Sequence, residues 1–359
     1  MEALYGPLEA AALLLLTAVT LPLQATFVAW RLAVGLVRTL TAPCRRGAAA
    51  AARPTAVLIT GAGSGIGAGL ARRYAAAGVT LHLSDRAAEG LAVTAEACRA
   101  AGATVVTAVV DVTDRAATAA WVRDADAASG LDLVIACAGI AQVTSDAWAP
   151  HYEAGAVEMY ARIFGVNTTG VLHTICPAID AMAGRRRGQV AIIGSLAGWV
   201  PLVPDPAYSG SKAAVLKFGR ALRHALWDTG VRVNVVTPGF IKTPLTDAVR
   251  EYKPFQVGLD YALDRIVAGL AADDAVIVFP PAMHVLVGFL ASVPWIISDA
   301  ILSLSHLSGR SLSSAPASVA AAPIAAPPAS TDGGAAALPV AAAAGGSARR
   351  RRRSGSEAR

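Results

Sequence analysis

The middle of the chain alternates short apolar runs with Ala-rich segments of helical pattern, and this alternation constrains the fold more than any other feature. The runs are nearly continuous in apolar residues, as strands covered on both faces of a sheet are. Strands that alternate with helices indicate a parallel, doubly wound α/β sheet. We predict seven strands, at residues 56–60, 80–84, 104–110, 131–136, 190–194, 231–237 and 275–279.

The first predicted strand runs directly into a glycine-rich loop that opens a helix. In dinucleotide-binding sheets, glycines at such positions allow a tight turn, close approach of a pyrophosphate and packing of helix on strand. The helix N-terminus offers free N–H groups to the phosphates. A flexible loop gives the same letters, but the place between strand and helix favours a Rossmann-type cofactor site. The loop consists of Gly61, Ala62, Gly63, Ser64, Gly65, Ile66 and Gly67.

An acidic residue ends the second predicted strand. Asp85 lies 24 residues after Gly61, near the offset expected for a carboxylate that binds the adenosine ribose hydroxyls. A carboxylate there repels a 2′-phosphate, so NAD is favoured over NADP. The adjacent Arg86 weakens this preference, because an arginine can hold that phosphate. The alternative is that Asp85 only caps the following helix.

A tyrosine and a lysine four residues apart form the second candidate constellation. Tyr208 and Lys212 share one face of a predicted helix. A phenol has a pKa near 10 and is a poor base at neutral pH, but a neighbouring ammonium favours the phenolate. The pair gains weight because Ser195 ends a predicted buried strand 13 residues before Tyr208. Tyr208 is therefore a candidate general acid and base.

These segments together resemble the short-chain dehydrogenase/reductase family over about residues 54–280. The resemblance implies a nicotinamide-dependent oxidoreductase that acts on an alcohol or a ketone, but it specifies neither the substrate nor the direction. The matching motifs, in the family's order, are TGAGSGIG at 60–67, Asp111 in VVDVTD, Asn167 in FGVNTTG, Ser195 in IIGSLAG, Tyr208 and Lys212 in YSGSK, and PGFIKTP at 238–244.

The resemblance also implies a role for each matching side chain. Tyr208 would be the acid/base, Lys212 would lower its pKa and bind the nicotinamide ribose, and Ser195 would bind the substrate oxygen. Asn167 would hold a water in a proton relay. Asp111 would contact adenine and Thr243 the carboxamide. The remaining expected cofactor contacts are Val112, Ala138, Gly139, Pro238, Gly239 and Ile241.

One segment departs from the family pattern. The family's NNAG motif reads here Ala136-Cys137-Ala138-Gly139, so both asparagines are missing. Cys137 can occupy the space of an asparagine but hydrogen-bonds poorly. This departure supports the alternative function, a catalytically weak cofactor-binding scaffold or membrane-associated interaction protein.

The N-terminal segment, residues 1–53, is predicted to be a membrane anchor and basic linker. Residues 10–30 contain no charged residue, and about 20 apolar residues suffice to span a bilayer. Arginines follow this segment while glutamates precede it, so the positive-inside rule places the main domain in the cytosol. The endoplasmic reticulum is one candidate membrane. A signal peptide, a transit peptide and a hairpin in one leaflet are the alternatives.

The C-terminal part divides into an apolar segment and a polar tail. Residues 281–310 are apolar but interrupted by prolines. They are predicted to cover the substrate pocket or to lie on the membrane surface, with an ordinary buried helix as the alternative. Residues 311–359 are rich in Ala, Pro, Ser and Gly and end in a run of arginines, a composition typical of disorder.

Charge and cysteine content exclude several other classes. The net charge is +6, but residues 311–359 carry +4 of it, so the body shows no basic face for nucleic acid. The four cysteines show no metal-binding spacing and are expected to be free thiols. The anchor and the apolar segment suggest a lipophilic alcohol or ketone, and the family resemblance suggests a homodimer or a tetramer.

Overall fold

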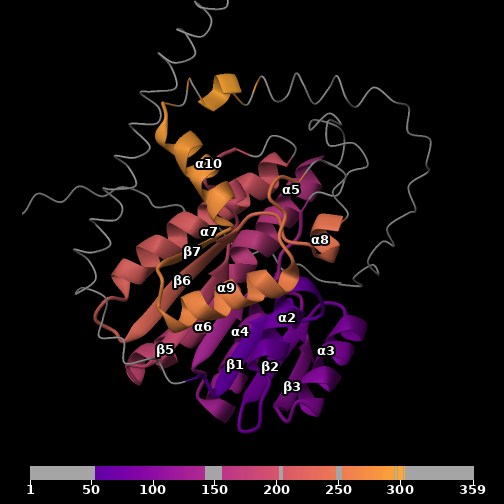
Figure 1. Ribbon diagram of the computed structural model, residues 1–359. Coiled ribbons are helices and arrows are strands. Elements are labelled where there is room, and N and C mark those ends of the chain that lie inside the picture. The colour runs from indigo at the N-terminus through magenta and orange to yellow at the C-terminus, as the bar shows by residue number, and fades with distance from the viewer. Residues whose placement is uncertain are drawn as a thin grey trace, which may run out of the picture. The chain divides into compact units, whose positions relative to one another are not determined.

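The computed structural model confirms the Rossmann-type α/β fold. It describes residues 53–141, 156–201, 205–247, 253–294, 296, 298–301 and 303. All strands of the seven-stranded sheet are parallel, in the order β3-β2-β1-β4-β5-β6-β7 (Figure 1). The strands are β1 (Ala56–Thr60), β2 (Thr80–Asp85), β3 (Thr104–Val109), β4 (Leu133–Ala136), β5 (Gly188–Ile193), β6 (Val231–Pro238) and β7 (Val276–Phe279).

The strand order reverses beside β1. The chain builds outward from β1 through β2 to β3, then crosses back so that β4 pairs with the other side of β1. The centre of β1 registers with both neighbours, because Val57 lies opposite Leu81 of β2 and Leu133 of β4. In open α/β sheets ligands bind outside the carboxyl ends of the strands at such a switch point.

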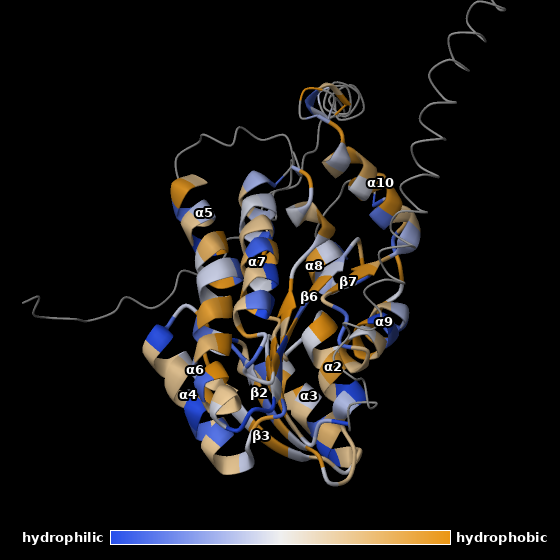
Figure 2. Ribbon diagram, turned by 90° about the vertical axis from the view of Figure 1, so that its left-hand side faces the viewer, coloured by the Kyte–Doolittle hydropathy of each residue, from blue (hydrophilic) through white to orange (hydrophobic). Residues whose placement is uncertain are grey.

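Helices cover both faces of the sheet, each over its own apolar core (Figure 2). Helices α2, α3 and α9 lie on one face, and α4, α6 and α7 lie on the other. Alternate residues of β1 serve the two cores: Val57 and Ile59 face the first, and Leu58 faces the second. The helices are α2 (Gly65–Tyr74), α3 (Ala88–Ala100), α4 (Arg115–Ser129), α5 (Ala156–Phe164), α6 (Gly170–Gly184), α7 (Pro206–Ala225), α8 (Pro244–Asp247), α9 (Leu259–Ala271) and α10 (Pro281–Ser292).

The structure corrects two details of the predicted strands. Strand β3 is not covered on both faces: its Val106 and Val109 side chains are 45% and 63% exposed. The reason is its place at the edge of the sheet, where β2 is its only paired strand. The boundaries also shift, since β4 begins two residues later than predicted, at Leu133, and β5 two residues earlier, at Gly188.

The predicted terminal segments are described only in part. The apolar segment from residue 281 begins with α10, which contacts β7. Within the described ranges, no helix combines the length and apolar character that crossing a membrane requires. The predicted anchor at residues 10–30 and the predicted tail at residues 311–359 lie outside the described residues.

Candidate active site

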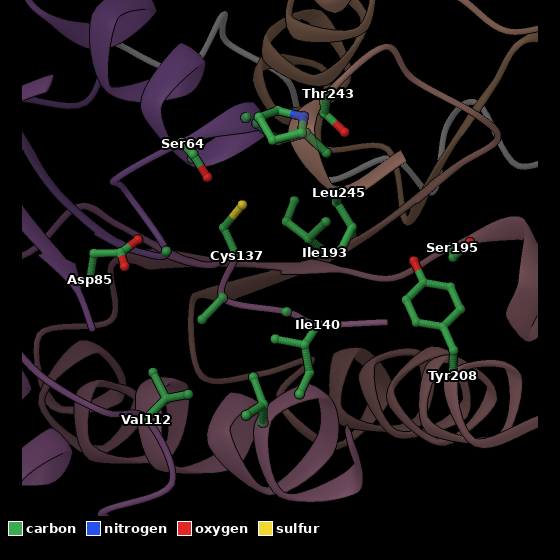
Figure 3. A pocket seen from close by; sticks show the side chains of 18 of the residues that line it. Ser64, Asp85, Val112, Cys137, Ile140, Ile193, Ser195, Tyr208, Thr243 and Leu245 are labelled. Atoms are coloured by element: carbon green, nitrogen blue, oxygen red, sulfur yellow. The ribbon is translucent and has the colours of Figure 1, made fainter. Parts of the chain in front are cut away.

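A cavity of about 350 Å³ lies beyond the carboxyl ends of the strands. Figure 3 shows Asp85 toward one end and Tyr208 with Ser195 toward the other. Segments far apart in the sequence therefore meet here as predicted, but Gly63 and Asn167 are not in the lining. The predicted residues that line the cavity are Gly61, Ser64, Gly65, Ile66, Gly67, Asp85, Arg86, Asp111, Val112, Ala138, Gly139, Ser195, Tyr208, Lys212, Pro238, Gly239, Ile241 and Thr243.

The glycine-rich loop is shaped by close backbone contacts. Gly61 has a φ of +69°, and a Cβ on it would lie 2.7 Å from the Cα of Ala138. A Cβ on Gly67 would collide with the carbonyl oxygen of Gly61, so only glycine lets α2 start this close to β1. Ser64 precedes α2 without capping it through its side chain. The first N–H groups of α2 are thus left to face the cavity, as phosphate binding requires.

Asp85 is held in place by two backbone donors. The N–H of Gly63 donates to Oδ2 at 2.8 Å, and the N–H of Ala87 donates to Oδ1 at 2.9 Å. Gly63 therefore does not line the cavity, but its N–H orients the carboxylate of Asp85. The alternative, that Asp85 caps the following helix, is not what the structure shows, because Ala87 is the N-cap residue of α3 and no side chain caps this helix. Because Asp85 also lines the cavity beside Arg86, its bond to Ala87 does not exclude a role in binding.

The side chains of Tyr208, Ser195 and Lys212 meet at the other end of the cavity. Asp205 caps α7, accepting from the N–H of Tyr208 at 2.9 Å. The Tyr208 side chain forms a hydrogen bond with that of Ser195, which follows β5. One turn further along α7, Lys212 lies with its Nζ 5.6 Å from the centroid of the Tyr208 ring. Its Nζ donates to the carbonyl oxygen of Ile193 at 2.9 Å.

Burial controls the protonation of this group. Burial raises the pKa of Tyr208 to about 12, although the hydrogen bond to Ser195 acts to lower it. Burial also lowers the pKa of Lys212 to about 8. The expected lowering of the Tyr208 pKa by Lys212 is not seen, because burial of the phenol has the larger effect and raises the pKa. In this structure Tyr208 is a protonated phenol at neutral pH.

Asn167 lies behind the cavity, in a π-helical turn at Gly165–Thr169. Its Oδ1 accepts from the N–H of Ile140 at 2.8 Å, and its Nδ2 donates to the carbonyl oxygen of Ile140, also at 2.8 Å. Nδ2 donates as well to Oγ of Ser211 at 3.0 Å. The fully buried side chain thus joins the chain after β4 to α7. Its implied water-holding role stays a prediction.

Comparison with known proteins assigns this site to a family. A family model described as short chain dehydrogenase matches residues 55–254. The chain belongs to the short-chain dehydrogenase family. It is therefore an oxidoreductase of a family that acts on hydroxyl and keto groups, as the motifs predicted.

Proteins similar to this short-chain dehydrogenase include solved structures in complex with NAD and with NADPH. It is 37% identical over 224 residues to an uncharacterized oxidoreductase of Myxococcus xanthus, covering 62% of this chain and 86% of that protein. A Burkholderia phymatum short-chain dehydrogenase/reductase in complex with NAD aligns with a TM-score of 0.57 and 27% identity, covering 64% and 90% of the two chains. A Sphingobium yanoikuyae short-chain dehydrogenase in complex with NADPH aligns with a TM-score of 0.56 and 25% identity, covering 74% and 98%.

The segment that departs from the family pattern lines the cavity of this short-chain dehydrogenase. The backbone N–H groups of Cys137 and Ala138 lie 3.1 and 3.4 Å from Oγ1 of Thr60, which ties the end of β1 to the chain after β4. Burial raises the pKa of the Cys137 thiol to about 12, so it stays protonated at neutral pH. Cys98, Cys137 and Cys176 are free thiols, as predicted, while Cys44 lies outside the described residues. The described residues contain no group of potential metal ligands.

Several lining residues were not predicted. Ile140 follows the altered motif, and Leu245 and Thr246 extend the predicted PGFIKTP segment into α8. Ile140, Leu245 and Thr246 could have been predicted, because each lies beside one of these motifs in the sequence. Arg162 comes from α5, and no motif marks it. Only the packing of α5 against α7 brings it to the cavity.

Proposed function

We propose that this short-chain dehydrogenase is an NAD-dependent, membrane-anchored enzyme that uses Tyr208 as acid/base on a lipophilic alcohol or ketone. The observation that carries the proposal is that Tyr208 and Ser195 meet at one end of the cavity (Figure 3) and that Lys212 lies beside the Tyr208 ring in the same lining. The glycine loop and Asp85 lie in the same lining. A reacting carbon placed beside Tyr208 would therefore lie within the same cavity as the cofactor.

The residues present fit a nicotinamide dinucleotide. The open N-terminus of α2 suits the pyrophosphate, and the carboxylate of Asp85 suits the ribose hydroxyls. Lys212 is placed to reach a second ribose, and Thr243 lines the cavity where the carboxamide is expected. When bound, the cofactor accepts or supplies the hydride. Everything else in the reaction falls to side chains of this chain.

Tyr208 would transfer the proton to or from the substrate oxygen. In reduction its protonated phenol donates that proton to the ketone oxygen, which Ser195 holds by a hydrogen bond. In oxidation the phenolate accepts the proton of the alcohol. Because burial holds the Tyr208 pKa near 12, the phenolate depends on positive charge from Lys212 and the oxidised cofactor. We expect the rate of oxidation to rise with pH up to about pH 8, above which Lys212 loses its positive charge.

The preference for NAD rests on Asp85. Its carboxylate is fixed by Gly63 and Ala87, so it cannot turn away from a 2′-phosphate without losing both bonds. The negative charge would repel that phosphate. Arg86 lines the same cavity and works against this preference. We expect NADH to bind more tightly than NADPH.

The lipophilic substrate and the membrane are proposed from the two apolar segments. Residues 10–30, outside the described residues, are long enough and apolar enough to anchor the chain. After β7, the described residues expose Leu286 on α10, at 45%, and Ile296, at 64%. An anchored enzyme of this kind meets substrates that partition into the bilayer. The arginines after residue 30 would place the catalytic domain in the cytosol.

The decisive experiment measures binding and turnover separately on the purified full chain. NADH and NADPH are titrated by fluorescence, and lipophilic alcohols and ketones are then screened for turnover. We expect tighter binding of NADH, turnover on at least one substrate, and a loss of kcat of at least about 1000-fold in Tyr208→Phe. NADH binding should survive this substitution, because it removes only the phenolic oxygen.

The same experiment tests the alternative function. Binding of NADH without turnover on any substrate would favour a cofactor-binding scaffold, for which the altered motif at residues 136–139 is the support. Turnover that persists in Tyr208→Phe would contradict the acid/base assignment. Failure to bind either nucleotide would refute the enzyme proposal as a whole.

A further inference from the structure

A second hollow, of about 640 Å³, lies at the opposite edge of the sheet from the active site. It is formed where β1, β4, β5 and β6 begin, at the edge from which those strands run toward the cofactor cavity. A single carboxylate, Asp132, stands in its lining. Five arginines line it with Asp132: Arg53, Arg73, Arg186, Arg187 and Arg232.

The carboxylate of Asp132 is already saturated by other groups. Its Oδ2 accepts from the N–H and the hydroxyl of Thr55 at 2.9 and 2.8 Å, and from the N–H of Ala56 at 3.3 Å. Its Oδ1 lies 3.3 Å from Arg187, whose side chain is 71% exposed. One carboxylate so engaged cannot neutralise the arginines around it. Arg73 has its own partners outside the lining, Asp260 and Asp264, each at 2.9 Å.

Capping of helix ends explains part of the arginine cluster. Nη2 of Arg53 donates to the carbonyl oxygens of Arg73 and Tyr74 at the end of α2, at 2.9 and 3.4 Å. Nη2 of Arg186 donates to the carbonyl oxygen of Asp228 at 2.7 Å. Arginines commonly satisfy the last carbonyls of helices in this way. Each such contact uses few of the five N–H donors of a guanidinium.

Arg232 has no such explanation. It is the second residue of β6 and is half-buried, yet within the described part of the chain its guanidinium makes no hydrogen bond or ion pair. Its charge and that of Arg53 both act on the phenol of Tyr74, whose pKa burial raises to about 12. Two guanidinium groups far apart in the sequence therefore act on the same buried phenol. A half-buried cation with no partner is costly, so its environment favours an anion.

We propose that this arginine-lined hollow binds the phosphate of an anionic phospholipid headgroup. The choice of a lipid rests on the proposed membrane anchor. The chain enters the described domain at Arg53, on the rim of the hollow, after a linker at residues 31–52 that follows the predicted span. That linker carries arginines and no acidic residue, so it offers no anionic side chain to the hollow. An anionic membrane surface complements both the linker and the hollow.

The test uses the full chain in neutral detergent and short-chain phosphatidylglycerol as the probe. We expect it to raise the midpoint of thermal unfolding by about 3 °C or more. Phosphatidylcholine of the same chain length and inorganic phosphate, each at the same concentration, should raise it by less than about 1 °C. The variants Arg232→Gln and Arg187→Gln should lose most of the shift. Arg123→Gln, an exposed arginine on α4, should keep it.

Each contrary result overturns a defined part of the proposal. An equal shift with phosphatidylcholine would mean that the hollow does not recognise the negative charge of the headgroup. An equal shift with inorganic phosphate would mean that it does not require a lipid. A shift that survives in Arg232→Gln and Arg187→Gln would place binding elsewhere. NADH titration of the same variants should be unchanged, because the cofactor cavity lies at the other edge of the sheet. If the unmodified chain fails to bind NADH, the proposed function is refuted, but the lipid result still stands.

Discussion

At the scale of single residues, Asn167 shows how a side chain can serve a site without lining it. Its amide bonds to both backbone polar groups of Ile140, a residue that does line the cavity. Its third bond, to Ser211, reaches the helix that carries Tyr208 and Lys212. The amide is suited to this because it combines an acceptor with two donors. The position of Ile140 relative to α7 therefore depends on this one side chain.

Replacement of Asn167 should destabilise the protein, and more so by alanine than by aspartate. Asn167→Asp keeps the acceptor for the N–H of Ile140 but loses the donors to its carbonyl and to Ser211. Asn167→Ala loses all three bonds and leaves polar groups unsatisfied, so we expect it to lower the free energy of unfolding by about 1–3 kcal/mol. Urea denaturation of the purified chain measures both. A change below about 0.5 kcal/mol in the alanine variant would contradict this assignment.

At the scale of secondary-structure elements, the start of α2 depends on glycine. Gly67 lies in the first turn of α2, where a Cβ would collide with the backbone of Gly61. Backbone cannot move aside as the end of a flexible side chain can. The collision would push α2 away from the end of β1, and with it the N–H groups that face the cavity.

We expect Gly67→Ala to abolish measurable NADH binding or to reduce it at least about 100-fold, because a 1 Å displacement has effects of this size on a built site. Fluorescence titration gives the affinity. Gly184→Ala is the matched control: Gly184 ends α6, and a Cβ on it would meet nothing within 4 Å. It should leave affinity unchanged. Equal affinities for the two variants would refute the role given to the loop.

At the scale of the whole molecule, Lys212 links stability to pH. Burial of its ammonium lowers its pKa from 10.5 to about 8, although Cys137 acts to raise it. Between these two values the unfolded chain holds a proton that the folded protein has lost. Stability therefore rises with pH through this window. The raised pKa of Tyr208 acts with the opposite sign above pH 10, where the unfolded phenol ionises first.

The variant Lys212→Met isolates this contribution. It keeps an aliphatic chain in place and removes the titrating group. The unfolding free energy of the wild type relative to the variant should increase by about 1 kcal/mol per pH unit from about pH 8 to 10. Denaturant titrations of both proteins at several pH values give this difference. A difference that does not change with pH would show that Lys212 titrates at its ordinary value.

The sequence by itself was sufficient for the sheet and for most of the lining of the candidate active site. Alternating apolar runs require strands covered by helices, and a glycine loop between strand and helix has few other uses, so local chemistry determined these features. The edge position of β3, with its exposed Val106 and Val109, was not predictable, because its apolar run resembles those of the central strands. Only strand order decides which run lies at the edge.

Tertiary structure alone decided how side chains distant in sequence are paired. The bonds of Asn167 to Ile140 cross 27 residues, and no local pattern indicates them. Burial, which also follows from packing, set the pKa values of Tyr208 and Lys212 against the expectation from their spacing. The arginines of the second hollow are scattered from residue 53 to residue 232 and look unrelated in the sequence. They become neighbours only because the parallel strands begin, and the helices that precede them end, at one edge of the sheet.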